Sequence, residues 1–209
     1  MKCQRHPAAA AHAGHCAACL LEEALLARED TAVASELTIE MPLGETAAGS
    51  VHLVRAAPRA PLLRLKTWHA AAPAGFLPAF ATLRDGLRTW GTPEIAAPLA
   101  ATVNERGLPS VLSTFRSGMP IPTLVANGRM DRARAAAHLD HLERVIRSGH
   151  SRGLVHGSIR AGNVMALADG SPAYLLDFGL AALLGLADDA PRPADDLTGL
   201  TELSAAMGL

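Results

Sequence analysis

The chain is poor in aromatic side chains, in net charge and in long apolar runs. Phenylalanine, tryptophan and tyrosine make up 3% of its 209 residues, so an aliphatic core is expected. The net charge of −1 gives no basic surface of the kind that nucleic acid requires. No apolar run approaches the ~20 residues of a membrane-spanning helix. The opening MKCQRHP lacks the apolar stretch of a signal peptide. We therefore expect a cytoplasmic protein that binds neither nucleic acid nor membrane.

Cysteine is also scarce, and its position is informative. The chain has 3 cysteines, and all of them lie near its start. The pattern Cys-x-x-His followed by Cys-x-x-Cys is the ligand spacing of a tetrahedral structural zinc site, and it predicts zinc on Cys3, His6, Cys16 and Cys19. His12 and His15 are alternate ligands. A redox Cys-x-x-Cys pair or an unstructured tail would also account for the pattern, although no strand precedes the pair. The absence of cysteine elsewhere favours a reducing compartment.

The most specific motif occupies residues 154–180. An amphipathic segment leads into the loop HGSIRAGN, which runs from His156 to Asn163. Two apolar runs, VMAL and AYLL, follow on either side of Asp169 and Gly170, a dipeptide typical of tight hairpins. The stretch closes with DFG at residues 177–179. DFG alone would be weak evidence, and it could stand by chance in another helix-loop-hairpin fold, but this order of elements is far more restrictive.

This order resembles the catalytic loop, hairpin and DFG turn of protein kinases, in particular the bacterial serine/threonine-kinase-like group. The resemblance implies that Asn163 and Asp177 hold Mg²⁺ against the phosphates of ATP, and that Arg160 lies near the transferred phosphate. At the place of the catalytic aspartate, however, the chain has Ser158. A serine hydroxyl is a very poor base near neutral pH, so the sequence indicates a nucleotide cleft and also argues against efficient phosphate transfer.

Upstream segments fit the same resemblance. LGETAAGSVHLVR resembles a glycine-rich loop, with nucleotide-binding positions at Gly44, Gly49 and Val51, and with Thr46 in place of the middle glycine. The run PLLRLKTW resembles the next strand, with Lys66 as the residue that pairs with the phosphates. Arg64 stands where the family has a small residue over the adenine. Its guanidinium would obstruct adenine, bind an anion, or extend into solvent along the sheet.

Several family features are missing. The glutamate that pairs with the strand lysine should lie in the helix FLPAFATLRDGLRTW, but no glutamate occurs between Trp68 and Trp90, and Ala79 aligns with its place. Asp85 is the nearest acidic residue. After DFG only a short, proline-rich linker precedes ADDLTGLTELSAAMGL, which resembles the helix whose aspartate, here Asp195 or Asp196, anchors the catalytic loop. Most of the peptide-substrate platform is therefore expected to be absent.

Two further elements are predicted, the first from the same resemblance and the second from its apolar pattern. The segment from Glu94 to Ile121 fits two strands and a turn, with residues 111–115 as the strand that leads into the second lobe. MDRARAAAHLDHLERVIRSGHSRG is an amphipathic helix with Leu139, Leu142, Val145 and Ile146 on one face. Its histidines, His138, His141 and His150, are expected to be solvated.

The resemblance implies an α+β, bilobal fold with a small antiparallel β lobe at residues 37–116 and a truncated, mainly helical lobe at 117–209. Residues 1–30 would form the zinc knuckle and a helix. The favoured function is a degenerate kinase-like module, or pseudokinase, that binds ATP and Mg²⁺ and regulates or scaffolds a protein partner. The alternatives are an active atypical phosphotransferase that uses ATP, and a scaffold with an empty cleft.

Overall fold

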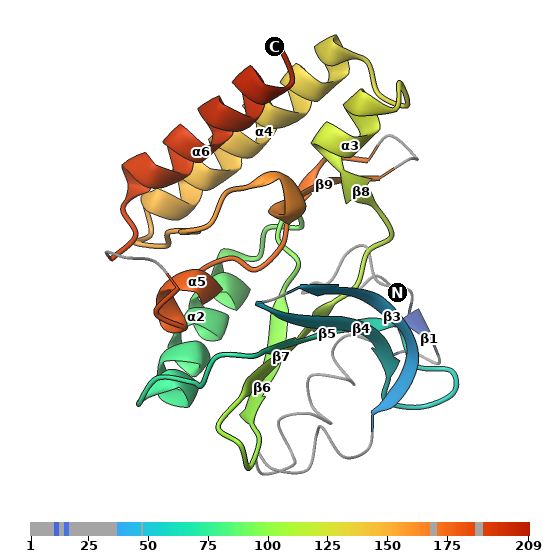
Figure 1. Cartoon of the computed structure of the whole chain (residues 1–209), viewed down its shortest axis with the longest axis vertical. Coiled ribbons are helices and arrows are strands. Elements are labelled where there is room, and N and C mark those ends of the chain that lie inside the picture. Colours follow the sequence, from blue (N-terminus) through green and yellow to red (C-terminus); the bar gives the residue numbers. More distant parts are fainter. Residues whose placement is uncertain (1–10, 13–14, 17–36, 47, 168–170, 187–189) are drawn as a thin grey trace. The chain divides into compact units, whose positions relative to one another are not determined.

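The structure is a computed structural model that describes residues 11–12, 15–16, 37–46, 48–167, 171–186 and 190–209. The chain divides into two compact units (Figure 1). The first unit contains residues 1–72 and 98–115, and the second contains residues 73–97 and 116–209. In the described part of the chain, no helix is both long enough and apolar enough to span a membrane.

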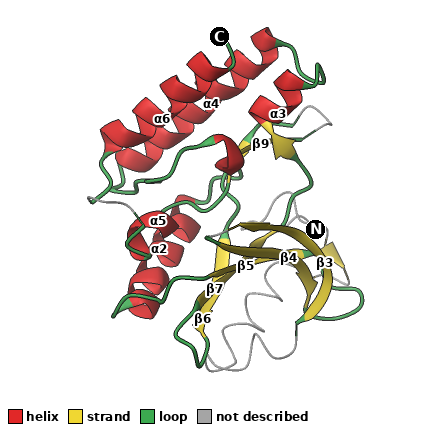
Figure 2. Ribbon diagram, viewed as in Figure 1, coloured by secondary structure: helices red, strands yellow, loops and turns green. Residues whose placement is uncertain are grey.

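The first unit is built on a five-stranded antiparallel sheet in the order β3-β4-β5-β7-β6 (Figure 2). The predicted glycine-rich hairpin and the strand after it form β3, β4 and β5, and the two strands expected after Glu94 form β6 and β7. The bounds are Thr38–Thr46, Gly49–Arg55, Leu63–Trp68, Pro98–Val103 and Pro109–Thr114. The strand and hairpin predictions are therefore confirmed for this unit.

One face of this sheet carries an aliphatic core. Val54, Leu63 and Leu112 are buried at 0%, 2% and 3% exposure, and Val54 lies directly opposite Leu63. Gly49 begins β4 because the neighbouring strand comes very close there. A Cβ atom at Gly49 would lie 2.2 Å from the carbonyl oxygen of Thr67, a distance that no side chain tolerates. A separate two-residue hairpin pairs β1, Ala11–His12, with β2, His15–Cys16.

The second unit is mainly helical. Its helices are α2, α3, α4, α5 and α6, at Phe76–Trp90, Ile121–Ala126, Arg132–His150, Leu180–Leu183 and Pro193–Ala206. A small sheet in the order β10-β9-β8 pairs Tyr174–Leu175 with Val164–Ala166 and then with Met119–Pro120. The two strands expected on either side of Asp169 and Gly170 are present as the antiparallel pair β9 and β10, while the dipeptide itself lies outside the described residues.

Helices α4 and α6 lie side by side over a continuous aliphatic core (Figure 1). The predicted apolar face of α4 is confirmed, since Leu139, Leu142 and Ile146 are buried there. Asp131 caps the helix, and its side chain accepts a hydrogen bond from the backbone N–H of Arg134 at 2.7 Å. Core residues from α6, Leu200 and Leu203, belong to the same cluster. This packing brings the start of α6 beneath the loop that follows α4.

Candidate active site

The loop from His156 to Asn163 is tied to α6 by one carboxylate. Asp196 is fully buried, and its Oδ2 and Oδ1 atoms accept hydrogen bonds from the backbone N–H groups of His156 and Gly157 at 2.9 and 2.8 Å. The imidazole Nε2 of His150 lies 2.9 Å from Oδ2. Of the two aspartates proposed from the sequence, Asp196 is thus the anchor. Asp195 instead accepts the backbone N–H of Arg192 at 2.8 Å and closes the first turn of α6.

The predicted metal-binding pair lies together on this loop and the DFG turn. Asn163 is 4% exposed and ends the short 3₁₀ helix η1, Ala161–Asn163. Its carbonyl oxygen accepts the backbone N–H of Leu176 at 2.9 Å, which places the residue before Asp177 directly beside it. Its Nδ2 donates to the carbonyl oxygen of Ser158 at 2.9 Å, and this bond orients the amide. Asn163 and the DFG turn therefore lie next to each other, as the sequence motif predicted.

The backbone at Asp177 is unusual. Its φ of 59° is the only positive value among the described residues other than glycine. A non-glycine residue in the left-handed region costs free energy, and such residues gather at functional sites. The neighbouring Gly179 also has a positive φ of 73°, and its N–H donates to the carbonyl oxygen of His156 at 3.0 Å. The DFG turn is thus held against the loop from His156 to Asn163 in a strained but hydrogen-bonded conformation.

His156 begins the loop, but its side chain packs into the interior of the protein. The side chain is fully buried, and its ring centroid is 5.1 Å from that of Phe178. Its Nδ1 accepts the backbone N–H of Ser158 at 3.2 Å, while Nε2 has no hydrogen-bond partner in the described part of the chain. Burial lowers the pKa of His156, although the charges of Asp196 and Asp177 oppose that shift. We infer a neutral, structural imidazole.

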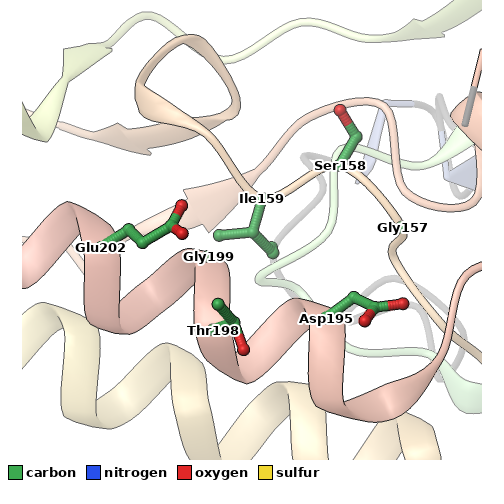
Figure 3. A pocket seen from close by; sticks show the side chains of 7 residues that line it. All are labelled: Gly157, Ser158, Ile159, Asp195, Thr198, Gly199 and Glu202. Carbon is green, nitrogen blue, oxygen red and sulfur yellow. The ribbon is translucent and has the colours of Figure 1, made fainter.

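Ser158 is one of the residues that line a polar cavity of about 260 Å³ between the loop and α6 (Figure 3). The other lining residues are Gly157, Ile159, Asp195, Thr198, Gly199 and Glu202. Gly199 lets helix and loop approach closely, because a Cβ atom there would lie 2.8 Å from the Ile159 carbonyl oxygen. Arg160, the residue expected near the transferred phosphate, is exposed just before η1.

Three of the nucleotide-binding positions predicted in the first unit, Gly44, Val51 and Lys66, lie in one row across its sheet. Gly44 pairs with Val51, and Val51 pairs with Lys66. The Nζ atom of Lys66 lies 4.7 Å from the ring centroid of Trp68, a cation–π contact on the same face of β5. Gly49 pairs with Trp68 itself. The sheet therefore brings all of these positions together on adjacent strands.

Arg64, two residues before Lys66, is 9% exposed. The option that its guanidinium extends into solvent is therefore wrong, because a snorkelling arginine would leave its charged end accessible. Ala79, the residue aligned with the missing glutamate, is exposed on α2. Asp85 is exposed and forms ion pairs with Arg84 and Arg88, so it is engaged by its own helix.

The prediction that the α4 histidines are solvated is wrong. The Nε2 of His150 is bonded to buried Asp196, and the His150 side chain is 11% exposed. The Nε2 of His141 lies 3.0 Å from Oε1 of Glu94, and the Nε2 of His138 is buried with no hydrogen-bond partner among the described residues. Burial raises the pKa of Glu94, but hydrogen bonds from Thr92 and His141 outweigh it and hold that pKa below its usual range. The helical pattern alone gave no signal of these long-range partners.

Three of the four predicted zinc ligands, Cys3, His6 and Cys19, lie outside the described residues, and Cys16 lies in β2. The alternate ligands His12 and His15 pair with each other across the β1–β2 hairpin. No group of three or more histidine, cysteine or acidic side chains is placed to hold a metal ion in the described ranges.

The sequence matches no protein-family model and no curated protein. Among solved structures, it is similar to the crystal structure of the Mycobacterium tuberculosis PknI kinase domain, with a TM-score of 0.66 and 20% identity over 83% of this chain and 72% of that one. A double mutant of the same domain gives a TM-score of 0.67 with the same identity and coverage. At this identity the likeness establishes the fold, and the chain has the bilobal α+β fold of protein kinases.

Proposed function

We propose that the chain is a pseudokinase module, which binds a nucleotide with Mg²⁺ but does not transfer phosphate efficiently. One observation carries this proposal: Ser158 takes the place of the catalytic aspartate in a loop that is otherwise assembled. Asp196 anchors the loop at His156 and Gly157, and Asn163 closes it at Ser158. The loop keeps the hydrogen bonds that hold it in place but has a non-basic residue at this position. This combination favours nucleotide binding over proton transfer.

The contacts of Ser158 support this interpretation. Its Oγ lies 3.5 Å from the Asn163 Nδ2, which is a hydrogen-bond donor and cannot accept a proton. The nearest imidazole, that of His156, already accepts the Ser158 backbone N–H through Nδ1. No carboxylate or free imidazole nitrogen is bonded to the hydroxyl in the ranges that the structure describes. Nothing there would raise the basicity of Ser158 or take a proton from an acceptor hydroxyl.

The remaining site residues suit Mg²⁺ and phosphate. Asn163 and Asp177 supply an amide oxygen and a carboxylate, the hard oxygen ligands that Mg²⁺ prefers, on two segments joined by the Leu176–Asn163 backbone bond. When bound, the metal would neutralise phosphate charge. Lys66 would face the phosphates, and Gly44, Gly49 and Val51 would lie along the nucleotide. Ser158 and Arg160 would lie where the acceptor and transferred phosphate meet in an active kinase.

A structural zinc site on Cys3, His6, Cys16 and Cys19 belongs to the same proposal. The spacing of these residues supports it, and metal would supply the folding energy that so short a segment cannot obtain from a core. A knuckle of this kind joined to a degenerate kinase fold suits a regulatory or scaffold protein of the reducing cytoplasm that binds a protein partner.

An active, atypical phosphotransferase is the second candidate. It is favoured by the retained Asn163 and Asp177 and by the strained backbone of Asp177. Phosphoryl transfer depends largely on positioning and charge stabilisation, so weak activity does not strictly require a carboxylate base. A scaffold with an empty nucleotide site is favoured by the buried Arg64.

Calorimetric titration with ATP, with and without Mg²⁺, tests these functions. The proposal expects Mg²⁺-dependent binding that is lost in Asp177→Ala and kept in Asp85→Ala, a matched loss of an exposed carboxylate on α2. If millimolar ATP does not bind, the scaffold with an empty nucleotide site is the function that remains. Binding together with steady transfer of phosphate to the chain or to a generic protein substrate would establish the phosphotransferase instead.

A further inference from the structure

A second cavity lies in the helical unit, at residues other than those of the candidate active site. Its volume is about 180 Å³, and its lining comes from α3, the turn before α4, the first turn of α4 and the residue after β9. The lining residues are Leu124, Arg129, Met130, Arg134 and Leu167. Leu124 and Met130 are each 5% exposed, so the cavity has an apolar wall beside two guanidinium groups.

Among the described residues, the two arginines have no acidic partner. The Nη1 of Arg129 lies 3.4 Å from the sulfur of Met119, and neither guanidinium takes part in an ion pair in the part of the chain that the structure describes. Asp131 lies between them in sequence, but its Oδ1 accepts the backbone N–H of Arg134 at the start of α4. The segment NGRMDRAR contains three arginines and one aspartate, so its net charge is positive.

The surroundings strengthen this positive field. Both arginines lie within one turn of the start of α4, a helix of 19 residues whose N-terminus carries partial positive charge. One turn further along, burial lowers the pKa of His138, and the charges of Arg134 and His141 lower it more. Arg134 is half-buried, where a cation gains more from a bonded anion than it would in water.

We propose that this cavity binds the carboxylate of an acidic side chain from a protein partner. A guanidinium presents parallel N–H donors that match a carboxylate, and two arginines line this cavity. Leu124, Met130 and Leu167 would contact the methylene groups of the same side chain, which favours glutamate over a bare anion. The volume is below the ~300–1,000 Å³ of small-molecule pockets and suits a single side chain. The proposal goes beyond the nucleotide function and does not depend on it.

The test is an NMR titration of the ¹⁵N-labelled full chain with acetyl-Leu-Glu-Leu-amide at millimolar concentration. The neutral isostere, acetyl-Leu-Gln-Leu-amide, and inorganic phosphate are titrated in parallel. We expect saturable shifts at the amides of Leu124, Arg129 and Leu167 with the glutamate peptide only. Arg129→Gln and Arg134→Gln should each weaken binding about tenfold, because each removes charge-assisted hydrogen bonds.

Arg144→Gln is the matched control, since it removes the same charge from an exposed position on the same helix and should leave binding unchanged. Arg129 is exposed, so its variant should fold even if Arg134→Gln does not. Equal shifts with the glutamine peptide, or equal loss in Arg144→Gln, would overturn the proposal. Binding of phosphate without binding of the glutamate peptide would overturn the assignment to a protein partner.

Discussion

The Oδ2 atom of Asp196 accepts a hydrogen bond from the backbone N–H of His156 at 2.9 Å, across 40 residues of sequence. Because the carboxylate is fully buried, water cannot replace that bond. The same group bonds Gly157 and His150, so one side chain joins the end of α4, the loop from His156 to Asn163 and α6. The position of Ser158 and of the Asn163–Asp177 pair therefore depends on a contact outside the site itself.

Asp196→Ala should destabilise the fold by about 3 kcal/mol or more, because it leaves two buried N–H groups without an acceptor. The measurement is the free energy of unfolding in urea. Asp195→Ala removes the neighbouring carboxylate, which is exposed and bonds only Arg192 among the described residues, and it should cost much less. Equal losses in the two variants would contradict the assignment of Asp196 as the anchor.

Stability should fall as the pH drops below about 6.5, the ordinary pKa of histidine in an unfolded chain. Burial depresses the pKa of His156 in the folded state, so between that lower pKa and 6.5 the unfolded chain binds more protons. Protonation then favours unfolding, by at most about 1.4 kcal/mol per pH unit for this group. The depressed pKa of His138 acts in the same direction.

Urea unfolding at a series of pH values between neutrality and pH 5 measures this slope. His138→Gln should reduce it without abolishing it, because His156 remains. Glu94 contributes a separate loss at lower pH, below its usual carboxyl pKa, since its own pKa is depressed in the folded state. A stability that stays constant from pH 7 to pH 5 would contradict the neutral, buried state of His156.

Gly199→Ala should lower stability by about 1–3 kcal/mol, although alanine is the better helix former. The added methyl group would lie 2.8 Å from both the Cβ and the carbonyl oxygen of Ile159, so α6 and the loop must separate. Gly162→Ala is the control, because nothing lies within 4 Å of its added Cβ. Thermal unfolding of both variants measures the difference, and a Gly199→Ala variant as stable as wild type would refute this close packing.

Patterns local in sequence predicted most of the fold. The apolar repeat of Leu139, Leu142 and Ile146 gave α4, and an Asp-Gly turn between apolar runs gave β9 and β10. The neighbourhood of Asn163 and Asp177 was implied by the resemblance to the kinase motifs. In each case the interaction that decides the structure spans few residues, so the sequence carries it directly.

Long-range contacts could not be predicted in the same way. Asp195 and Asp196 are adjacent and chemically identical, and only packing against the loop determines which one is buried. His150 looks like a surface residue until α6 brings Asp196 to it. The sequence left three options for Arg64, which were to obstruct adenine, to bind an anion or to extend into solvent. Its burial in the folded chain excludes the last of these. These choices depend on tertiary packing, which overrides local pattern.

Ser158→Asp should increase Mg²⁺-dependent ATP hydrolysis, because it restores a base beside the Asn163–Asp177 pair. A positioned general base typically contributes about 10²–10⁴-fold, and we expect the lower end because the glutamate partner expected for Lys66 is missing. Ser151→Asp adds the same charge at an exposed position after α4 and should change nothing. Release of phosphate from ATP is the assay, since water needs no peptide platform. Ser158→Asp could bind ATP and Mg²⁺ as wild type does and yet hydrolyse ATP no faster. In that case the missing aspartate does not explain the low activity, and the defect lies in how the phosphates are held.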